Sequence, residues 1–147
     1  MNLRSIFSSW QVWAGLAALF AALTAIFAKV GIKEVNSNYA TFLRTCVVIV
    51  FLGLIVWLRG DYQPLPSISK KSLVFLFLSG LATGVSWLCY FYALKLGPVA
   101  QVAAVDKMSL LLVALAGVSL LGERLSLLAW LGLLLMAAGT VLLVLFK

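Results

Sequence analysis

The chain has 147 residues, of which 65% are hydrophobic and 10% are charged, and its formal net charge is +7. A soluble domain carries about a quarter of its residues as Asp, Glu, Lys or Arg, so this chain has too little polar surface to face water. The composition therefore predicts an integral membrane protein. Because there is no histidine and only four carboxylates, the sequence argues against an enzyme and against a metal site, and we expect no cofactor.

The eleven basic residues lie mostly singly at the ends of apolar runs, with Lys70 and Lys71 as the adjacent pair. This pattern is typical of side chains that anchor helix ends at lipid headgroups. It indicates membrane lipid, and not nucleic acid, as the partner of the positive charge. Cys46 and Cys89 both lie inside apolar runs, so no disulfide framework is expected.

Five apolar stretches are long enough to cross a bilayer, for which a helix needs about 20 residues. They predict an all-α bundle of five transmembrane helices at residues 9–29, 39–58, 72–94, 98–121 and 125–146. Prolines at positions 64 and 66 exclude regular helix from the longest connection, Gly60 to Lys71. We expect a single transmembrane domain over residues 1–147.

The first span has a competing interpretation as a secretory signal. Residues Met1–Ala25 combine a basic residue, an apolar core and small residues, as such signals do. The apolar run is too long for one, however, and a lysine follows it without a polar mature domain. We therefore treat this stretch as the first transmembrane helix.

The second and fourth predicted helices contain ionisable residues at membrane depth. Arg44 lies about 8 Å along the helix from Tyr39, and Asp106 about 12 Å from Pro98. Each charge near the centre of an inserted helix costs at least about 2.5–3.5 kcal/mol, so these residues require a reason. Both helices are entered from the same membrane face, which places Arg44 and Asp106 at similar depth. We expect either that they pair or that Arg44 reaches back to the headgroups.

Lys107 follows Asp106 directly, and neighbouring positions on a continuous helix point about 100° apart. The two side chains are therefore not expected to form a good ion pair with each other. Lys107 must then meet another carboxylate, backbone carbonyls, cavity water or a bound anion. We interpret Asp106 and Lys107 as part of a water-filled cavity or substrate site, with a purely structural interhelical pair as the alternative.

Two further groups of residues are candidates for the transport pathway. Ser86, Trp87 and Tyr90 lie near the end of the third helix, where Trp87 and Tyr90 share a face through their three-residue spacing. They either line a solute pathway or belong to an aromatic belt at the interface. Candidates for ion pairing or gating at the helix ends are Glu123, Arg124 and Lys29. For Glu123 and Arg124 the alternative is a hydrated ion pair that merely ends the fourth helix.

Several stretches of the chain occur in a recognisable order. They are SGLATGVSWLCYFYAL at Ser79–Leu94, then Gly97–Val105, Asp106-Lys107 and Leu121–Arg124, with Trp13-Ala14 and Phe27–Gly31 near the start. Together they resemble the EamA domain of the drug/metabolite transporter superfamily over essentially the whole chain. The resemblance implies a secondary-type transporter, an exporter of a small metabolite, in the bacterial inner (plasma) membrane.

Members of that family commonly carry two such domains, inverted relative to each other with the substrate between them, whereas this chain has one. Five crossings place the termini on opposite faces. One face carries Arg4, Arg59, Lys70, Lys71 and Arg124, and the other Lys29, Lys33, Lys95 and Lys147, joined by Arg44 if it reaches the surface. Since Lys and Arg asymmetry sets orientation, this near-balance predicts dual topology.

Insertion in both orientations leads to an antiparallel homodimer, which restores the inverted arrangement and works by alternating access around a midplane site. A paralogous membrane partner of opposite orientation is the alternative. Two other functions stay open at this point. One is a flippase for a lipid-linked sugar or polyprenyl phosphate, with Lys29, Lys33 and Arg44 as its basic pocket, and the other is a non-transporting membrane subunit.

Overall fold

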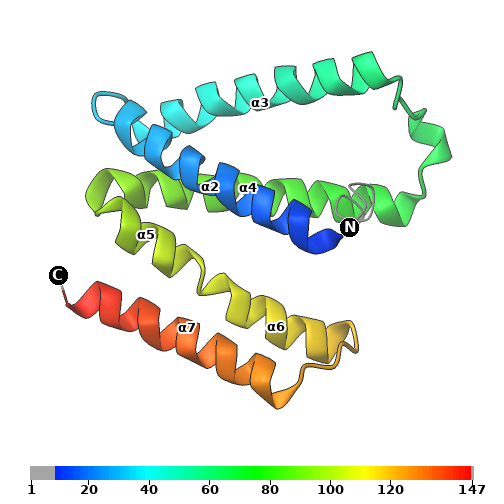
Figure 1. Cartoon of the computed structure of the whole chain (residues 1–147). Coiled ribbons are helices and arrows are strands. Elements are labelled where there is room, and N and C mark those ends of the chain that lie inside the picture. The colour runs from blue at the N-terminus through cyan, green and yellow to red at the C-terminus, as the bar shows by residue number, and fades with distance from the viewer. Residues whose placement is uncertain (1–8, 147) are drawn as a thin grey trace, which may run out of the picture. The chain divides into compact units, whose positions relative to one another are not determined.

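The computed structural model describes residues 9–146, all of whose regular structure is helical (Figure 1). The elements are α2 (Trp10–Gly31), α3 (Ser37–Arg59), the 3-10 turn η1 (Leu65–Ser67), α4 (Lys70–Leu96), α5 (Val99–Asp106), α6 (Ser109–Leu120) and α7 (Leu127–Leu145). Five spans are long and apolar enough to cross a membrane, and α5 and α6 together make up the fourth. The predicted all-α bundle with five transmembrane helices is confirmed. The basic residues at positions 4 and 147 lie outside the described residues.

Capping side chains explain why several helices begin earlier or later than their hydropathy indicates. The side-chain oxygen of Asn36 accepts a hydrogen bond from the backbone N–H of Asn38 at 2.9 Å, so α3 begins before the predicted position 39. The hydroxyl of Ser69 accepts the backbone N–H of Ser72 at 3.1 Å, and α4 accordingly begins before position 72. Ser126 caps α7, which begins after the predicted position 125.

The end of α3 is set by Gly60, whose φ of 67° is in the left-handed region. This conformation lets the N–H of Asp61 return to the carbonyl of Val56 at 3.1 Å, which satisfies an otherwise free helix-end acceptor. The connection that follows contains Pro64 and Pro66 and forms only the short turn η1, as the sequence predicts.

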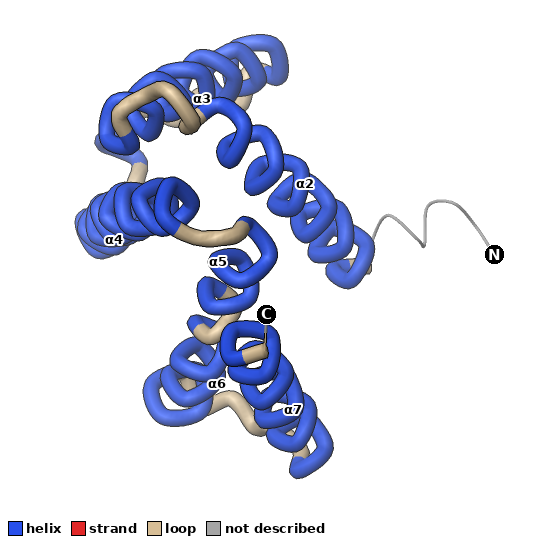
Figure 2. The backbone as a smooth tube through the Cα atoms, turned by 90° about the vertical axis from the view of Figure 1, so that its left-hand side faces the viewer, coloured by secondary structure: helices blue, strands red, loops and turns tan. Residues whose placement is uncertain are grey.

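The chain divides into two compact units. We call residues 27–96 the α3–α4 unit, and residues 97–146 with residues 9–26 the α5–α7 unit. Within the α3–α4 unit, the beginning of α3 lies beside the end of α4, and the two antiparallel helices diverge toward the connection that joins them (Figure 1). Within the α5–α7 unit, α7 runs antiparallel to α5 and α6, and the tan segment that separates α5 from α6 is visible in Figure 2.

The α3–α4 unit has its core where α3 begins and α4 ends. Leu94, Ile32 and Phe91 are 0%, 2% and 3% exposed there. Ser37 and Thr41 are also buried, and the hydroxyl of Thr41 donates to the carbonyl of Ser37 at 2.9 Å. The hydroxyl is thus satisfied within its own helix, which is how a polar side chain is tolerated in such a core.

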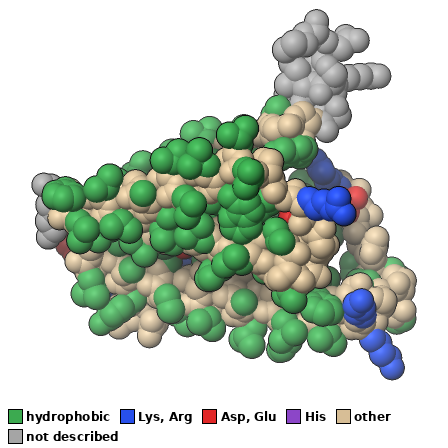
Figure 3. Space-filling model, turned by 90° about the horizontal axis from the view of Figure 1, so that it is seen from below, with side chains coloured by type: hydrophobic (Ala, Val, Ile, Leu, Met, Phe, Trp, Pro, Cys, Tyr) green, Lys and Arg blue, Asp and Glu red, His purple; other side chains and the backbone are tan. Residues whose placement is uncertain are grey.

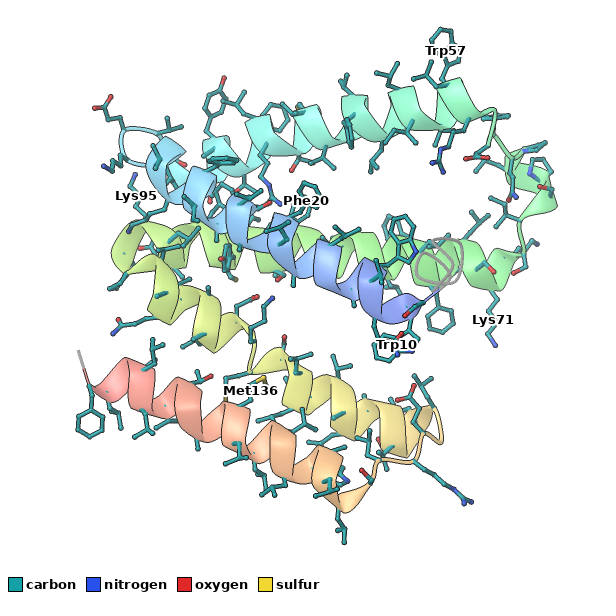
Figure 4. All side chains as sticks on the ribbon, viewed as in Figure 1. Trp10, Phe20, Trp57, Lys71, Lys95 and Met136 are labelled. Atoms are coloured by element: carbon teal, nitrogen blue, oxygen red, sulfur yellow. The ribbon has the colours of Figure 1, made fainter. Side chains whose placement is uncertain are left out.

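Two lysines form hydrogen bonds to backbone carbonyls at this end of the α3–α4 unit. The ammonium of Lys29 donates to the carbonyl of Leu94 at 2.5 Å, in the last turn of α4. The ammonium of Lys95 donates to the carbonyl of Val35 at 3.0 Å, in the turn between α2 and α3 (Figure 4). Each cation therefore satisfies a carbonyl that has no partner inside a helix, and it ties together segments about sixty residues apart in sequence.

Apolar side chains remain exposed along all five spans (Figure 3). Phe20 of α2 is 62% exposed and Trp57 of α3 is 76% exposed (Figure 4). Soluble monomers rarely expose contiguous apolar patches larger than a few hundred Å². A surface of this kind fits lipid or other membrane-embedded protein, so the chain is a multi-pass membrane protein.

We predict that Lys29→Met lowers the thermal unfolding midpoint of the detergent-purified protein. The substitution leaves the buried Leu94 segment with an unpaired carbonyl, and a lost hydrogen bond to a charged group costs about 1.5–3 kcal/mol. Lys33→Met is the matched control, because Lys33 lies exposed in the adjoining turn and donates no hydrogen bond within the α3–α4 unit. Equal midpoints for the two variants would show that the Lys29 contact contributes nothing to stability.

Candidate functional site

The fourth span is interrupted in its middle, although the sequence predicts one continuous helix over 98–121. Helix α5 ends at Asp106 and α6 begins at Ser109. Between them the N–H of Met108 donates to the carbonyl of Val105 at 2.9 Å, and the N–H of Leu110 to that of Lys107 at 3.0 Å. These are bonds between residues three apart, tighter than the α-helical pattern. Such short stretches inside a helix often mark functional positions.

Side chains satisfy the backbone at this junction. The hydroxyl of Ser109 donates to the carbonyl of Asp106 at 2.8 Å. From α7, the hydroxyl of Thr140 bonds to the carbonyl of Met136 at 3.0 Å and lies 3.5 Å from that of Ala104. Figure 4 shows Met136 on the part of α7 that faces the junction. Irregular backbone at membrane depth is tolerated only where protein or water satisfies it, and these two hydroxyls supply part of that requirement.

The prediction that Asp106 and Lys107 do not pair well with each other is wrong. The ammonium of Lys107 lies 3.5 Å from a carboxylate oxygen of Asp106. The backbone of Lys107 keeps right-handed helical angles, with φ −69° and ψ −12°. The contact forms because the lysine side chain is long and flexible enough for its ammonium to bend back to the neighbouring carboxylate.

This ion pair lies at membrane depth and on the surface of the chain. Asp106 is seven residues beyond Val99, which is about 10 Å along the helix. The Lys107 and Asp106 side chains are 56% and 40% exposed. Each charge exposed to hydrocarbon would cost several kcal/mol. The surface that carries the pair therefore requires water, a polar solute or another protein surface against it.

Arg44 of α3 lies against an aromatic face of α4 and not against a carboxylate of its own unit. Its guanidinium carbon is 4.2 Å from the ring centroid of Trp87 and 5.3 Å from that of Phe91. Tyr90, on the same side of α4, interacts electrostatically with it. A desolvated cation–π contact contributes about 2 kcal/mol, which offsets most of the about 2.5–3.5 kcal/mol that a charge at this depth costs.

The contact of Arg44 with Trp87 and Phe91 was not predicted from the sequence, which gave Arg44 either the lipid headgroups or Asp106 as its partner. Phe91 is four residues after Trp87 and so lies on the same helix face. Ser86 is exposed on α4 and does not join this cluster. The pairing of Arg44 with Asp106 stays a prediction, because the two residues belong to different compact units.

The proposed gating residues lie in two different settings. Lys29 is bound to the carbonyl of Leu94. Glu123 and Arg124 are both exposed in the connection from α6 to α7, and no ion pair joins them. The Glu123 carboxylate instead folds over the end of α6, so close that a Cβ built on Gly117 would lie 2.6 Å from its oxygen. Of the three basic residues in the flippase interpretation, two, Lys29 and Arg44, are already in contact with the protein.

Metal or cofactor ligands do not gather anywhere in residues 9–146. No three His, Cys, Asp or Glu side chains of these residues come together in a way that could hold a metal ion. Cys46 and Cys89 are unpaired and exposed.

Comparison with known proteins identifies the class of this chain. The model of the EamA-like transporter family matches residues 8–145. The chain belongs to the EamA-like transporter family, and it is a membrane transporter by class. A Sinorhizobium sp. protein named "uncharacterized transporter in cobO 3′ region" is 53% identical over 138 residues, covering 94% of this chain and 98% of that protein. No solved structure gives a significant match.

We predict that Thr140→Val lowers the thermal unfolding midpoint, because it removes the hydroxyl that serves the carbonyls beside the junction. An intramolecular hydrogen bond contributes about 0.5–1.5 kcal/mol net, and the isosteric valine keeps the packing volume. Thr83→Val is the matched control, since the exposed Thr83 hydroxyl bonds only to the carbonyl of Ser79 in its own helix. An equal or larger loss in Thr83→Val would contradict a special role for Thr140.

Proposed function

We propose that the protein is a secondary transporter that exports a small metabolite across the bacterial plasma membrane. In this proposal it works as an antiparallel homodimer by alternating access, and Asp106 and Lys107 line the solute cavity between the two copies. The family and the name of the Sinorhizobium relative support transport as the general activity. The solute, the direction and the dimer are proposed.

One observation carries the proposal: an exposed ion pair at a short stretch of tightened, 3-10-like helix in the middle of a span. Secondary transporters place their solute and coupling-ion sites near the bilayer midplane, where discontinuous helices present backbone groups and helix ends. A leucine-rich span that served packing alone would need neither the tightened stretch nor the charges. The exposure of both side chains provides the access that a solute or water requires.

The exposure of the ion pair supports the proposed dimer. In this proposal a second, inverted copy would cover the Asp106–Lys107 surface that a single copy leaves exposed. The basic residues at the two ends of the described spans are nearly balanced, with Arg59, Lys70, Lys71 and Arg124 opposite Lys29, Lys33 and Lys95. Such a balance gives the insertion machinery little reason to prefer one orientation.

Asp106 is the residue that we propose to carry a coupling proton. Among the five spans it is the one carboxylate, since Glu34, Asp61 and Glu123 all lie in the connections. Its pairing with Lys107 means that protonation of Asp106 would release the lysine, and deprotonation would recapture it. Exchange of a proton for a solute at this position would thus change the charge that the solute meets.

We predict that Lys107→Gln abolishes solute flux in reconstituted vesicles and leaves membrane abundance intact. The reason is that the variant removes the exposed cation beside the junction without touching the bonds that hold the backbone there. Flux is measured with radiolabelled amino acids and organic acids, with and without a pH gradient. Lys71→Gln, in the first turn of α4, is the matched control. A parallel loss of abundance would favour a structural role.

We further predict that C-terminal reporter fusions detect the terminus on both sides of the membrane. A fluorescent reporter active in the cytoplasm and a phosphatase active outside it should both give signal from the same expression host. Added lysines in the connection between α3 and α4 should push the population toward one orientation and reduce transport. A single orientation in every molecule would rule out dual insertion and favour a paralogous partner.

A further inference from the structure

We propose that Arg44 is the solute-recognition group of the α3–α4 unit and that it binds a carboxylate. In this proposal Trp87 and Phe91 are positioning residues that hold the guanidinium. The inference rests on the transport function proposed above, and it adds the chemical class of the solute and the residue that selects it.

The cluster holds Arg44 without neutralising its charge. Trp87 and Phe91 lie one helical turn apart on α4, and the guanidinium carbon lies over both rings, at 4.2 and 5.3 Å from their centroids. The rings carry no negative charge, and the five N–H donors of a guanidinium form a planar fork that suits an oxygen acceptor.

No carboxylate of the α3–α4 unit neutralises Arg44. Within residues 27–96, neither Glu34 nor Asp61 forms an ion pair with it, and its polar neighbour on α4 is Tyr90, which interacts with it electrostatically. The hydroxyls of Thr41 and Thr45 are directed to backbone carbonyls of α3. Arginine does not lose its proton in proteins. The charge is therefore permanent and half-buried, and no carboxylate of the unit balances it.

These properties select a carboxylate over other solutes. The planar fork of arginine matches the two oxygens of a carboxylate with two parallel hydrogen bonds. A cationic solute would be repelled, and a neutral amide offers one acceptor oxygen and no charge. Lysine in place of Arg44 would keep the charge but lose both the fork and the stacking, which makes Arg44→Lys the informative substitution.

The test measures binding to the purified full-length protein in detergent, with benzoate against benzamide, acetate against acetamide, and inorganic phosphate as probes. We expect each carboxylate to bind at least about tenfold more tightly than its amide, which is the scale of a charge-assisted hydrogen bond. Arg44→Lys should remove that preference. Trp87→Phe, which keeps a ring, should change carboxylate affinity by less than about threefold, whereas Trp87→Leu should weaken it clearly. Trp57→Leu, at the far end of α3, is the matched control and should have no effect.

Three results would overturn the proposal. The first is equal affinity for benzoate and benzamide, and the second is a preference that survives Arg44→Lys. The third is tighter Arg44-dependent binding of phosphate than of either carboxylate. Asp106→Asn adds a further check, because a large gain in benzoate affinity would show that Arg44 is occupied by Asp106. If Arg44→Lys does not fold, the comparison of Trp87→Leu with Trp87→Phe decides the question.

Binding and transport can fail separately. Arg44-dependent binding of carboxylates without flux in vesicles would refute the proposed transport and leave the site in place. Flux of solutes that carry no carboxylate, undiminished by Arg44→Lys, would support transport and refute this inference.

Discussion

Lipid hydrocarbon cannot form hydrogen bonds, so polar groups inside a membrane must find their partners within the protein, in water or in a solute. This constraint explains most of the polar contacts of the chain. Apolar burial cannot organise these helices as it does a soluble core, because lipid is as apolar as leucine. Each irregular backbone segment and each charge instead needs a specific partner that satisfies its hydrogen bonds or its charge. The hydroxyls of Ser109 and Thr140 donate to backbone carbonyls beside the tightened turn of the fourth span. Lys29 and Lys95 donate to backbone carbonyls near helix ends in the α3–α4 unit.

The two compact units meet this constraint in different ways. In the α5–α7 unit a cation is paired with an adjacent anion, and the pair remains exposed. In the α3–α4 unit a cation lies on aromatic rings and has no anion. The proposed function uses the first arrangement for coupling to an ion and the second for recognition of the solute.

Hydropathy and length were enough to predict all five spans, because a run of about twenty apolar residues has few alternatives in a membrane protein. The predicted helix starts were off by about two residues where Asn36, Ser69 and Ser126 act as caps. The tightened turn at Lys107 escaped prediction because the sequence around it, rich in Ala, Val and Leu, favours helix on both sides. The contact of Lys107 with Asp106 was missed because the direction of a side chain on a helix does not account for how far a long lysine side chain can bend. The position of Arg44 depends on which face of α4 meets α3, and hydropathy carries no information about that.

The hydrogen bonds that join the fourth span to α7 are unevenly distributed along its length. In the described chain, side-chain hydrogen bonds join α7 to α5, through Gln101 to the carbonyl of Leu143 at 3.1 Å and through Thr140, and none joins α7 to α6. Swinging α5 away from α7 would thus break directional bonds that lipid cannot replace, but swinging α6 would exchange one set of apolar contacts for another. The turn at Lys107 and Met108 thus separates an arm that hydrogen bonds tie to α7 from an arm that apolar contacts hold. In the proposed rocking motion, α6 would move at the lower cost, while Asp106 stays with the tied arm.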